Sequence, residues 1–185
     1  MRNRHSYHRW QVLLVDRDGL LIKNHPYLAD PEKVVVLDGV AEALSLARER
    51  GFRIAVISNQ SGIARDLISW RELYCVNQLV EELLGPFEGW FLCTHLPNAG
   101  CACRKPAPGL IVRAAEALRV PVGDCFMAGD RLSDVEAAFR AGTRGGLVPT
   151  PDTPVEEIAL SPKVFPTLTQ LVESLIAEGG GSTCA

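Results

Sequence analysis

The sequence predicts an α/β fold in which helices cover both faces of a central parallel sheet. Short apolar runs such as Val12–Val15 and Ile54–Ile57 have the composition of strands that are buried on both faces. These runs alternate with segments in which apolar residues recur at helical spacing. Such alternation is typical of strand–helix–strand units with parallel strands.

The expected elements follow one another along the chain. Ser69 and Glu72 form a capping-box pattern at the start of the second helix. Val135, Ala138 and Phe139 are expected to share one face of the fourth helix. We expect strands at residues 12–16, 53–58, 90–93, 124–129 and 145–148, and helices that start near residues 39, 70, 109, 131 and 168.

The remaining segments lack a regular period. Residues 1–11 are predicted to form a loose arm and residues 179–185 a frayed tail. Residues 20–37 should form a loop or hairpin flap that closes with a short strand, and the proline-rich residues 149–166 should be irregular. We therefore expect a single domain over residues 12–178, without a large inserted cap domain.

The composition narrows the class of protein. The chain has 185 residues, of which 47% are hydrophobic and 22% charged, and its formal net charge is -3. This length suffices for one domain with a real core. The negative charge provides no general attraction to nucleic acid or anionic membranes, and no apolar run is long enough to span a bilayer. We expect a cytoplasmic monomer that acts on a small molecule.

Acidic residues stand at the ends of two predicted strands. Asp16 and Asp18 follow the first strand, and Asp130 and Asp134 follow the fourth. Because parallel strands end at one edge of a sheet, these carboxylates should meet there and repel one another unless a cation lies among them. All-oxygen ligands suit Mg²⁺. Alternatively, the last two could simply favour a helix start, which explains Asp134 but not Asp16 and Asp18.

Positive and uncharged donors are predicted at the same edge. Arg104 and Lys105 precede the third helix, and Ser58 ends the second strand. The backbone N–H groups of Asn59 and Gln60 should add two further donors. With a metal ion, such donors form a receptor for a phosphoryl group, and a pair of Asp residues can transfer it through an aspartyl phosphate.

Three cysteines and a histidine form a second candidate metal site, within the loop at residues 93–103. Three thiolates and one imidazole suit tetrahedral Zn²⁺ with no open position, which is typical of a structural site. The alternative is an ordinary loop that binds no metal, with unrelated cysteines and a surface histidine. The four candidate ligands are Cys93, His95, Cys101 and Cys103.

These motifs resemble those of haloacid-dehalogenase (HAD) superfamily phosphatases, whose fold is Rossmann-like. Asp16-Arg17-Asp18-Gly19 resembles the first motif, Ser58 the second, Lys105 the third and Gly129-Asp130-x3-Asp134 the fourth. The resemblance implies that Asp16 is the nucleophile and Asp18 the general acid and base. It also implies that Asp130, the Asp16 side chain and the Asp18 carbonyl hold Mg²⁺, while Ser58 and Lys105 stabilise the phosphoryl group.

Within the superfamily, the chain is most similar to heptose 1,7-bisphosphate phosphatases. The segments 59–65 and 101–109 carry this resemblance. It implies that Arg104 helps to recognise the substrate, and that the turn at residues 24–27 contacts it. The expected substrate-binding residues are Asn24, His25, Pro26, Tyr27, Asn59, Gln60, Ser61, Arg104 and Arg131.

Three alternatives remain from the sequence. One is a nucleic-acid 3′-phosphatase, which the negative net charge and the lack of a basic stripe disfavour. Histidinol-phosphate phosphatases share the zinc loop, and Cys93-Thr94-His95-Leu96-Pro97 resembles them locally. The chain could also be a zinc-stabilised domain that binds phosphosugars without hydrolysing them, although that reading requires the loss of a catalytic carboxylate, and all of them are present. Our expectation is a magnesium-dependent phosphatase that acts on a heptose bisphosphate.

Overall fold

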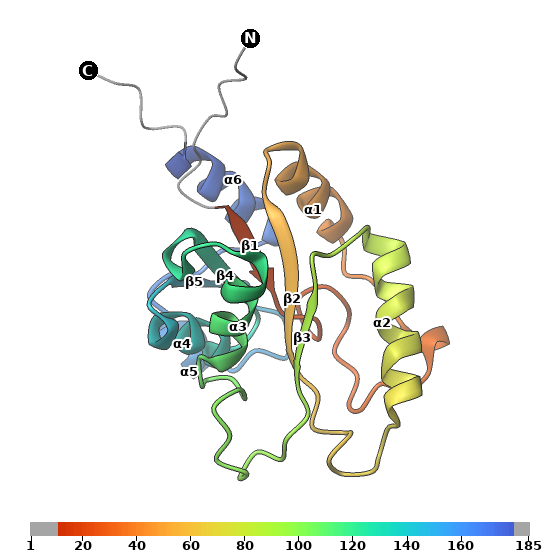
Figure 1. The fold of residues 1–185 in the computed structure, drawn as a ribbon. Helices are drawn as coiled ribbons and strands as arrows, with labels where there is room; N and C mark the ends of the chain where they lie inside the picture. Colours follow the sequence, from red (N-terminus) through yellow and green to blue (C-terminus); the bar gives the residue numbers. More distant parts are fainter. Residues whose placement is uncertain (1–10, 180–185) are drawn as a thin grey trace, which may run out of the picture.

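A single five-stranded parallel sheet forms the centre of the protein (Figure 1). The structure is a computed structural model that describes residues 11–179. The strand order is β3-β2-β1-β4-β5, so β1 is the central strand and β4 lies beside it. The strands are β1 (Val12–Val15), β2 (Arg53–Asn59), β3 (Trp90–Cys93), β4 (Cys125–Gly129) and β5 (Arg144–Leu147).

Helices cover both faces of the sheet. The helices α1, α2 and α6 lie on one face, and α3 and α4 lie on the other, with α5 beside α4. The α-helices are α1 (Val40–Glu49), α2 (Trp70–Leu84), α3 (Gly109–Leu118), α4 (Leu132–Ala141), α5 (Val155–Leu160) and α6 (Leu168–Gly179). Two short 3-10 helices, η1 (Pro31–Lys33) and η2 (Val122–Asp124), complete the described elements.

The side-chain alternation of β1 divides the core into two layers. Leu13 and Val15 pack into the layer beneath α1, α2 and α6, whereas Val12 and Leu14 pack into the layer beneath α3 and α4. All four are fully buried. Successive strand residues point to opposite faces, so a strand between two helix layers must be apolar throughout. The predicted α/β fold is confirmed.

Local signals in the sequence place several elements correctly. The capping box of α2 is present: Ser69 Oγ accepts from the N–H of Glu72 at 3.2 Å, and Glu72 Oε2 accepts from the N–H of Ser69 at 2.7 Å. No large domain is inserted after β1 or β2 within the described residues; only residues 16–39 and 60–69 link these strands to the next helices.

Three predictions about local structure are wrong. Residues 149–166 contain the six-residue helix α5. The sequence does not predict this helix because a tertiary contact supports it: the Glu157 carboxylate of α5 accepts from the Leu132 N–H of α4 at 2.7 Å. The flap pairs as a hairpin, because Ile22 bridges Val36 and the N–H groups of Lys23 and Leu37 donate to the Val35 and Leu21 carbonyls at 2.8 and 3.1 Å, but this pairing is too short to form the expected strand. Phe139 is 52% exposed, because it lies beside the buried face of α4 and not on it.

Two further observations concern the chain ends and membranes. The predicted arm and tail lie almost wholly outside the described residues, which start at 11 and end at 179. No helix within that range combines the length and the apolar character that crossing a membrane requires.

Candidate active site

Parallel pairing of β1 with β4 brings Asp16 and Asp130 together. Each follows the last residue of its strand, and the strands are neighbours in the sheet. One carboxylate oxygen from each of these residues and from Asp134, in the first turn of α4, lies within 4.8 Å of the others. A Cβ atom on Gly19 would lie 2.2 Å from Asp130 Oδ2. Glycine at position 19 therefore makes room for this carboxylate.

One buried ammonium group faces the carboxylates. Nζ of Lys105 lies 2.6 Å from Asp134 Oδ1 and 2.9 Å from Asp16 Oδ1, and it donates to the carbonyl of Ile57 at 2.9 Å. The Asn59 side chain accepts from the Lys105 N–H and donates to the Lys105 carbonyl, both at 3.1 Å. The end of β2 thus holds the lysine at both its backbone and its ammonium group.

Three carboxylates against one ammonium group leave a deficit of positive charge. Burial is the main cause that raises the pKa of Asp130 to about 8, and the neighbouring Asp16 and Asp134 add to it. Burial likewise raises the pKa of Asp16 to about 7, although Lys105 opposes this. Burial lowers the pKa of Lys105, but Asp134 and Asp16 outweigh it and leave this pKa raised.

The carboxylate cluster fits a hard divalent cation. Oδ1 of Asp130 is buried and has no hydrogen-bond partner among residues 11–179. A cation would supply both the missing charge and a partner for this oxygen. An all-oxygen donor set of this kind suits Mg²⁺ better than a soft metal ion.

The predicted general acid, Asp18, is held by three hydrogen-bonding groups. Nε and Nη2 of Arg17 donate to both of its oxygens, at 2.9 to 3.2 Å. Nε2 of Gln60 donates to Asp18 Oδ2 at 2.6 Å and to Ser58 Oγ at 2.8 Å. The Asp18 side chain remains 21% exposed, so its carboxylate borders the open side of the site.

The four residues of the second predicted metal site also lie close together. Sγ of Cys103 lies 3.3 Å from that of Cys93, 3.6 Å from that of Cys101 and 3.2 Å from His95 Nδ1. All four ligand atoms lie within 4.8 Å of one another. Burial raises the pKa of Cys93 to about 12, so its thiolate requires a nearby cation. The cluster therefore has the donor atoms and compactness of a tetrahedral metal site.

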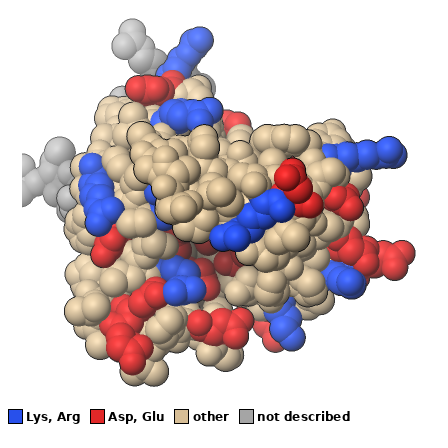
Figure 2. Space-filling model, turned by 90° about the horizontal axis from the view of Figure 1, so that it is seen from below, with Lys and Arg blue, Asp and Glu red and all other residues tan. Residues whose placement is uncertain are grey.

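The face at this edge of the sheet carries both signs of charge. Figure 2 shows it from below, with Lys and Arg side chains interspersed among Asp and Glu side chains. A continuous basic stripe, as found on proteins that bind nucleic acid, is not seen on the described part of this face.

Comparison with known proteins gives the family. The HAD-hydrolase-like family model matches residues 102–175. The D-glycero-beta-D-manno-heptose-1,7-bisphosphate 7-phosphatase of Helicobacter pylori is 33% identical over 143 residues, which are 75% of this chain and 83% of the relative. The chain belongs to the HAD-like phosphatase family. The enzyme of the same description from Escherichia coli K12 is 32% identical over 141 residues, 70% of this chain and 74% of the relative.

A solved structure extends the match to nearly the whole chain. The crystal structure of D,D-heptose 1,7-bisphosphate phosphatase from B. bronchiseptica, complexed with magnesium and phosphate, superposes with a TM-score of 0.82 at 28% identity. The match covers 91% of this chain and 99% of that one. Together with the curated relatives, it identifies this HAD-like chain as a phosphoric monoester hydrolase.

The structure brings the flap of this HAD-like phosphatase toward the loop after β2. A Cβ on Gly62 would lie 3.0 Å from Cδ1 of Tyr27, so the flap turn reaches that loop. Asn24, His25 and Pro26 are exposed on the same turn, and Ser61 is half-buried. The predicted substrate contacts of these residues stay predictions.

Three predicted substrate ligands are engaged by the protein itself. The Asn59 amide is bonded to the backbone of Lys105. The Gln60 N–H, expected as a free donor, instead donates to the Cys93 carbonyl at 2.6 Å, because the pairing of β2 with β3 continues one residue past the strand. The Arg131 guanidinium pairs with Glu157, whose oxygens lie 2.5 to 3.2 Å from Nε and Nη2. Arg131 thus holds α5 in place.

Two buried residues near Asp18 were missed from the sequence. Arg17 stands within the segment that resembles the first HAD motif, and no local signal in the sequence marks it as buried. Asn77 interrupts the apolar face of α2, and Arg17 Nη1 donates to its Oδ1 at 2.7 Å. The interruption of a regular apolar pattern is the one signal that could have revealed this pair.

We expect the metal-free protein to lose stability as the pH rises from about 4 to about 8. The pKa values of Asp16 and Asp130, about 7 and about 8, lie above their ordinary value of 3.8. The folded chain therefore binds more protons than the unfolded chain between these limits, and its stability falls as they dissociate. Mg²⁺ should offset the loss by compensating the carboxylate charges. Chemical denaturation at several pH values, with and without Mg²⁺, measures both effects.

The variant Asp130→Asn serves as the control for this experiment. It removes one of the two perturbed carboxylates, so both the decline with pH and the response to Mg²⁺ should become smaller. A decline that is the same in Asp130→Asn as in the wild type would contradict the assignment.

Proposed function

We propose that this chain is a magnesium-dependent phosphatase that removes the C7 phosphate of D-glycero-β-D-manno-heptose 1,7-bisphosphate. The observation that carries the proposal is the buried cluster of Asp16, Asp130, Asp134 and Lys105. It occurs in a chain 33% identical to a relative named for this reaction. The cluster supports the proposed phosphoryl-transfer chemistry, and the names of the relatives support the proposed substrate.

Asp16 is the proposed nucleophile. Its Oδ1 accepts from the Arg17 N–H at 2.8 Å and faces Lys105 Nζ, whereas Oδ2 has no hydrogen-bond partner within residues 11–179. Oδ2 therefore attacks phosphorus, and the ester bond to the sugar oxygen breaks as the new bond forms. The Lys105 ammonium group balances negative charge on the phosphoryl oxygens.

Asp18 is the proposed general acid and then the general base. As its carboxylic acid, it gives its proton to the departing sugar oxygen. As the resulting carboxylate, it accepts a proton from water while the water oxygen attacks phosphorus. That attack breaks the bond to Asp16, releases phosphate and restores both aspartates.

Asp16 and Asp130, with the backbone carbonyl of Asp18, are the proposed ligands of Mg²⁺. When bound, Mg²⁺ would neutralise charge on the phosphoryl group. Asp134 has a different role in this scheme. Its Oδ2 accepts from the Arg131 N–H at 3.1 Å while Oδ1 pairs with Lys105, so it joins the start of α4 to the lysine.

Arg104 is the best-supported of the proposed substrate ligands. Its Nη1 is buried and has no hydrogen-bond partner among the described residues. A buried guanidinium nitrogen without a partner favours an anionic ligand such as a phosphate. Arg104 also directly precedes Lys105, so a second anionic group of the substrate would lie beside the reacting phosphate.

Zn²⁺ is the proposed occupant of the cluster of Cys93, His95, Cys101 and Cys103. The cluster ends one residue before Arg104 and two before Lys105, so a bound metal would fix the segment that carries both cations. Few apolar residues anchor this loop, whereas structural Zn²⁺ contributes about 10–16 kcal/mol in small peptides. The proposed role is therefore structural.

Replacing the nucleophile should abolish turnover. The variant Asp16→Asn keeps the shape of the side chain but removes the attacking carboxylate, so kcat should fall by at least about 10³-fold. Steady-state assays with Mg²⁺ measure this, and circular dichroism checks that the fold is unchanged. Turnover within tenfold of the wild type would show that another group attacks phosphorus.

A panel of substrates tests the proposed specificity. The assay compares the two anomers of heptose 1,7-bisphosphate with histidinol phosphate, with Mg²⁺ present throughout. We expect the highest kcat/KM for the β-anomer and release of the C7 phosphate only. A higher kcat/KM for histidinol phosphate would replace the proposed substrate while leaving the phosphatase chemistry in place.

Loss of a cysteine ligand should release the proposed zinc. Cys103→Ser should lower the bound zinc from about one ion per chain to near zero and reduce kcat/KM, because Arg104 and Lys105 lose their support. Elemental analysis and kinetics provide the two measurements. Cys75→Ser, which alters a half-buried cysteine of α2 outside the cluster, is the matched control and should retain its zinc. Equal zinc content in both variants would contradict the assignment.

A further inference from the structure

Arg17 is a fully buried charge with an organised set of partners. Its side chain is 1% exposed, although it directly precedes the partly exposed Asp18. Two guanidinium nitrogens, Nε and Nη2, form a two-pronged contact with both Asp18 oxygens. The third nitrogen, Nη1, points to a different element and donates to Asn77 on α2. A planar guanidinium that is held at both ends has one orientation, and it imposes that orientation on the carboxylate.

Asn77 occupies a position where helix packing favours an apolar side chain. The buried face of α2 is formed by Leu73, Val76, Asn77, Val80 and Leu84, and Asn77 is the polar member of this face. A polar group at such a position costs stability unless it is hydrogen-bonded. Its Oδ1 accepts from Arg17 at 2.7 Å, so the bond to Arg17 accounts for an amide at this position.

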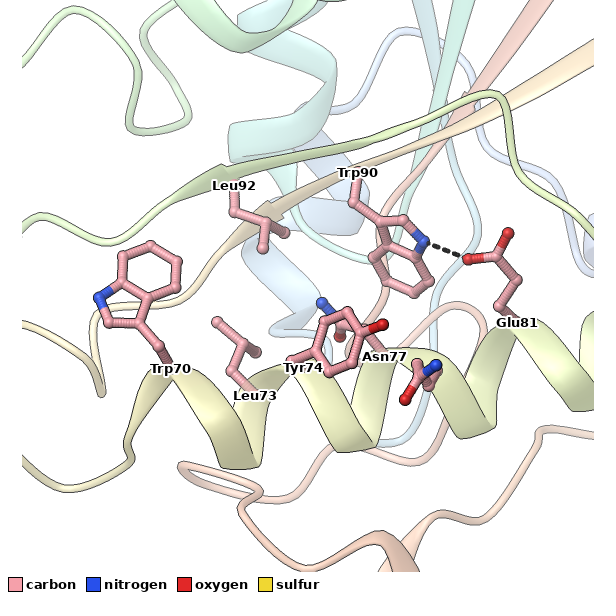
Figure 3. A pocket seen from close by; sticks show the side chains of 8 residues that line it. Trp70, Leu73, Tyr74, Asn77, Glu81, Trp90 and Leu92 are labelled. Carbon is pink, nitrogen blue, oxygen red and sulfur yellow. Dashed lines mark hydrogen bonds between the residues drawn. The ribbon is translucent and has the colours of Figure 1, made fainter.

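Asn77 lies among largely apolar side chains. Figure 3 shows Asn77 on α2, on the side of the helix that faces Trp90 and Leu92 of β3. It lies at a pocket of about 380 Å³ whose lining is mostly aromatic and aliphatic. Glu81, the acidic residue of this pocket, accepts from Trp90 Nε1 at 2.9 Å and from the Phe87 N–H at 3.3 Å. Of the polar side chains at this pocket, Asn77 is the one with a hydrogen bond to Arg17.

We propose that Arg17 and Asn77 are positioning residues for proton transfer by Asp18. This inference rests on the proposed function, in which Asp18 protonates the departing oxygen. Arg17 faces both oxygens of the Asp18 carboxylate and fixes their orientation, and Asn77 keeps Arg17 in the plane that this contact requires. The helix α2 thus supports the general acid, although its residues do not take part in the reaction.

The test uses the dependence of the rate on the acidity of the leaving alcohol or phenol. Protonation matters greatly for an alkyl phosphate, whose alkoxide is a poor leaving group, and little for p-nitrophenyl phosphate. Asn77→Leu removes the hydrogen-bond acceptor and replaces it with an apolar side chain of similar size, which suits the apolar face of α2. We expect kcat/KM, which reports the steps up to departure of the leaving group and not the later hydrolysis of the aspartyl phosphate, to fall about tenfold or more for alkyl phosphates and to change less than about threefold for p-nitrophenyl phosphate. The ratio of the two kcat/KM values does not depend on the fraction of folded enzyme.

Two further variants act as controls. Asn77→Asp retains an oxygen acceptor for Arg17 and should restore a ratio close to that of the wild type. Gln78→Ala alters the next residue of α2, which is exposed on the same pocket without a bond to Arg17, and should leave the ratio unchanged. Asp18→Asn gives the limit for complete loss of the general acid.

The outcomes separate this inference from the proposed function. An equal fall in kcat/KM for both substrate types in Asn77→Leu, or failure of Asn77→Asp to restore the ratio, would overturn the positioning role while leaving Asp18 as the general acid. If the wild type and Asp18→Asn show the same dependence on the leaving group, then proton donation by Asp18 fails, and the inference fails with it. A selective loss in Asn77→Leu with recovery in Asn77→Asp supports the inference.

Discussion

The contact of the Lys105 ammonium group with Asp16 and Asp134 is the interaction on which the site depends. Three carboxylates at one edge of a sheet repel one another, and burial strengthens that repulsion. Lys105 offsets one unit of negative charge and leaves the remainder for a divalent cation. The same contact joins the end of β1 to the first turn of α4 and the loop after β3, so a charge requirement also fixes the relative position of three elements.

The fold meets this requirement with glycines and with support outside the site. Gly19 and Gly129 have no side chain where a Cβ would overlap the carboxylates of Asp130 and Asp134, at 2.2 and 2.1 Å. Lys105 comes from a loop without strong apolar anchors. The paired bonds from Asn59 hold its backbone, and the proposed metal-binding cluster that starts at Cys93 would add a second support. The backbone that carries the long, flexible Lys105 side chain is therefore held in place.

The sequence predicts what depends on strands and on where they end. The apolar runs identify the first four strands, and the acidic residues that follow β1 and β4 identify Asp16 and Asp130 as neighbours, because parallel strands share an edge. The sequence does not predict contacts that only the tertiary structure creates. The helix α5 depends on Glu157 contacts with Arg131 and Leu132. The Gln60 N–H was expected to be free because the sequence does not show how far the pairing with β3 continues.

A buried charge that packing does not require points to function. Burying the Arg17 guanidinium costs free energy of desolvation, and its pair with Asp18 recovers that cost only with good geometry and further hydrogen bonds. An apolar side chain at position 77 would pack the inner face of α2 at no such cost. The arrangement becomes understandable when the carboxylate of Asp18 must keep one orientation while it loses and regains a proton. The departure of Asn77 from the apolar pattern of α2 is therefore as informative as agreement with the sequence motifs, since Asn77 connects this helix to the proposed general acid through Arg17.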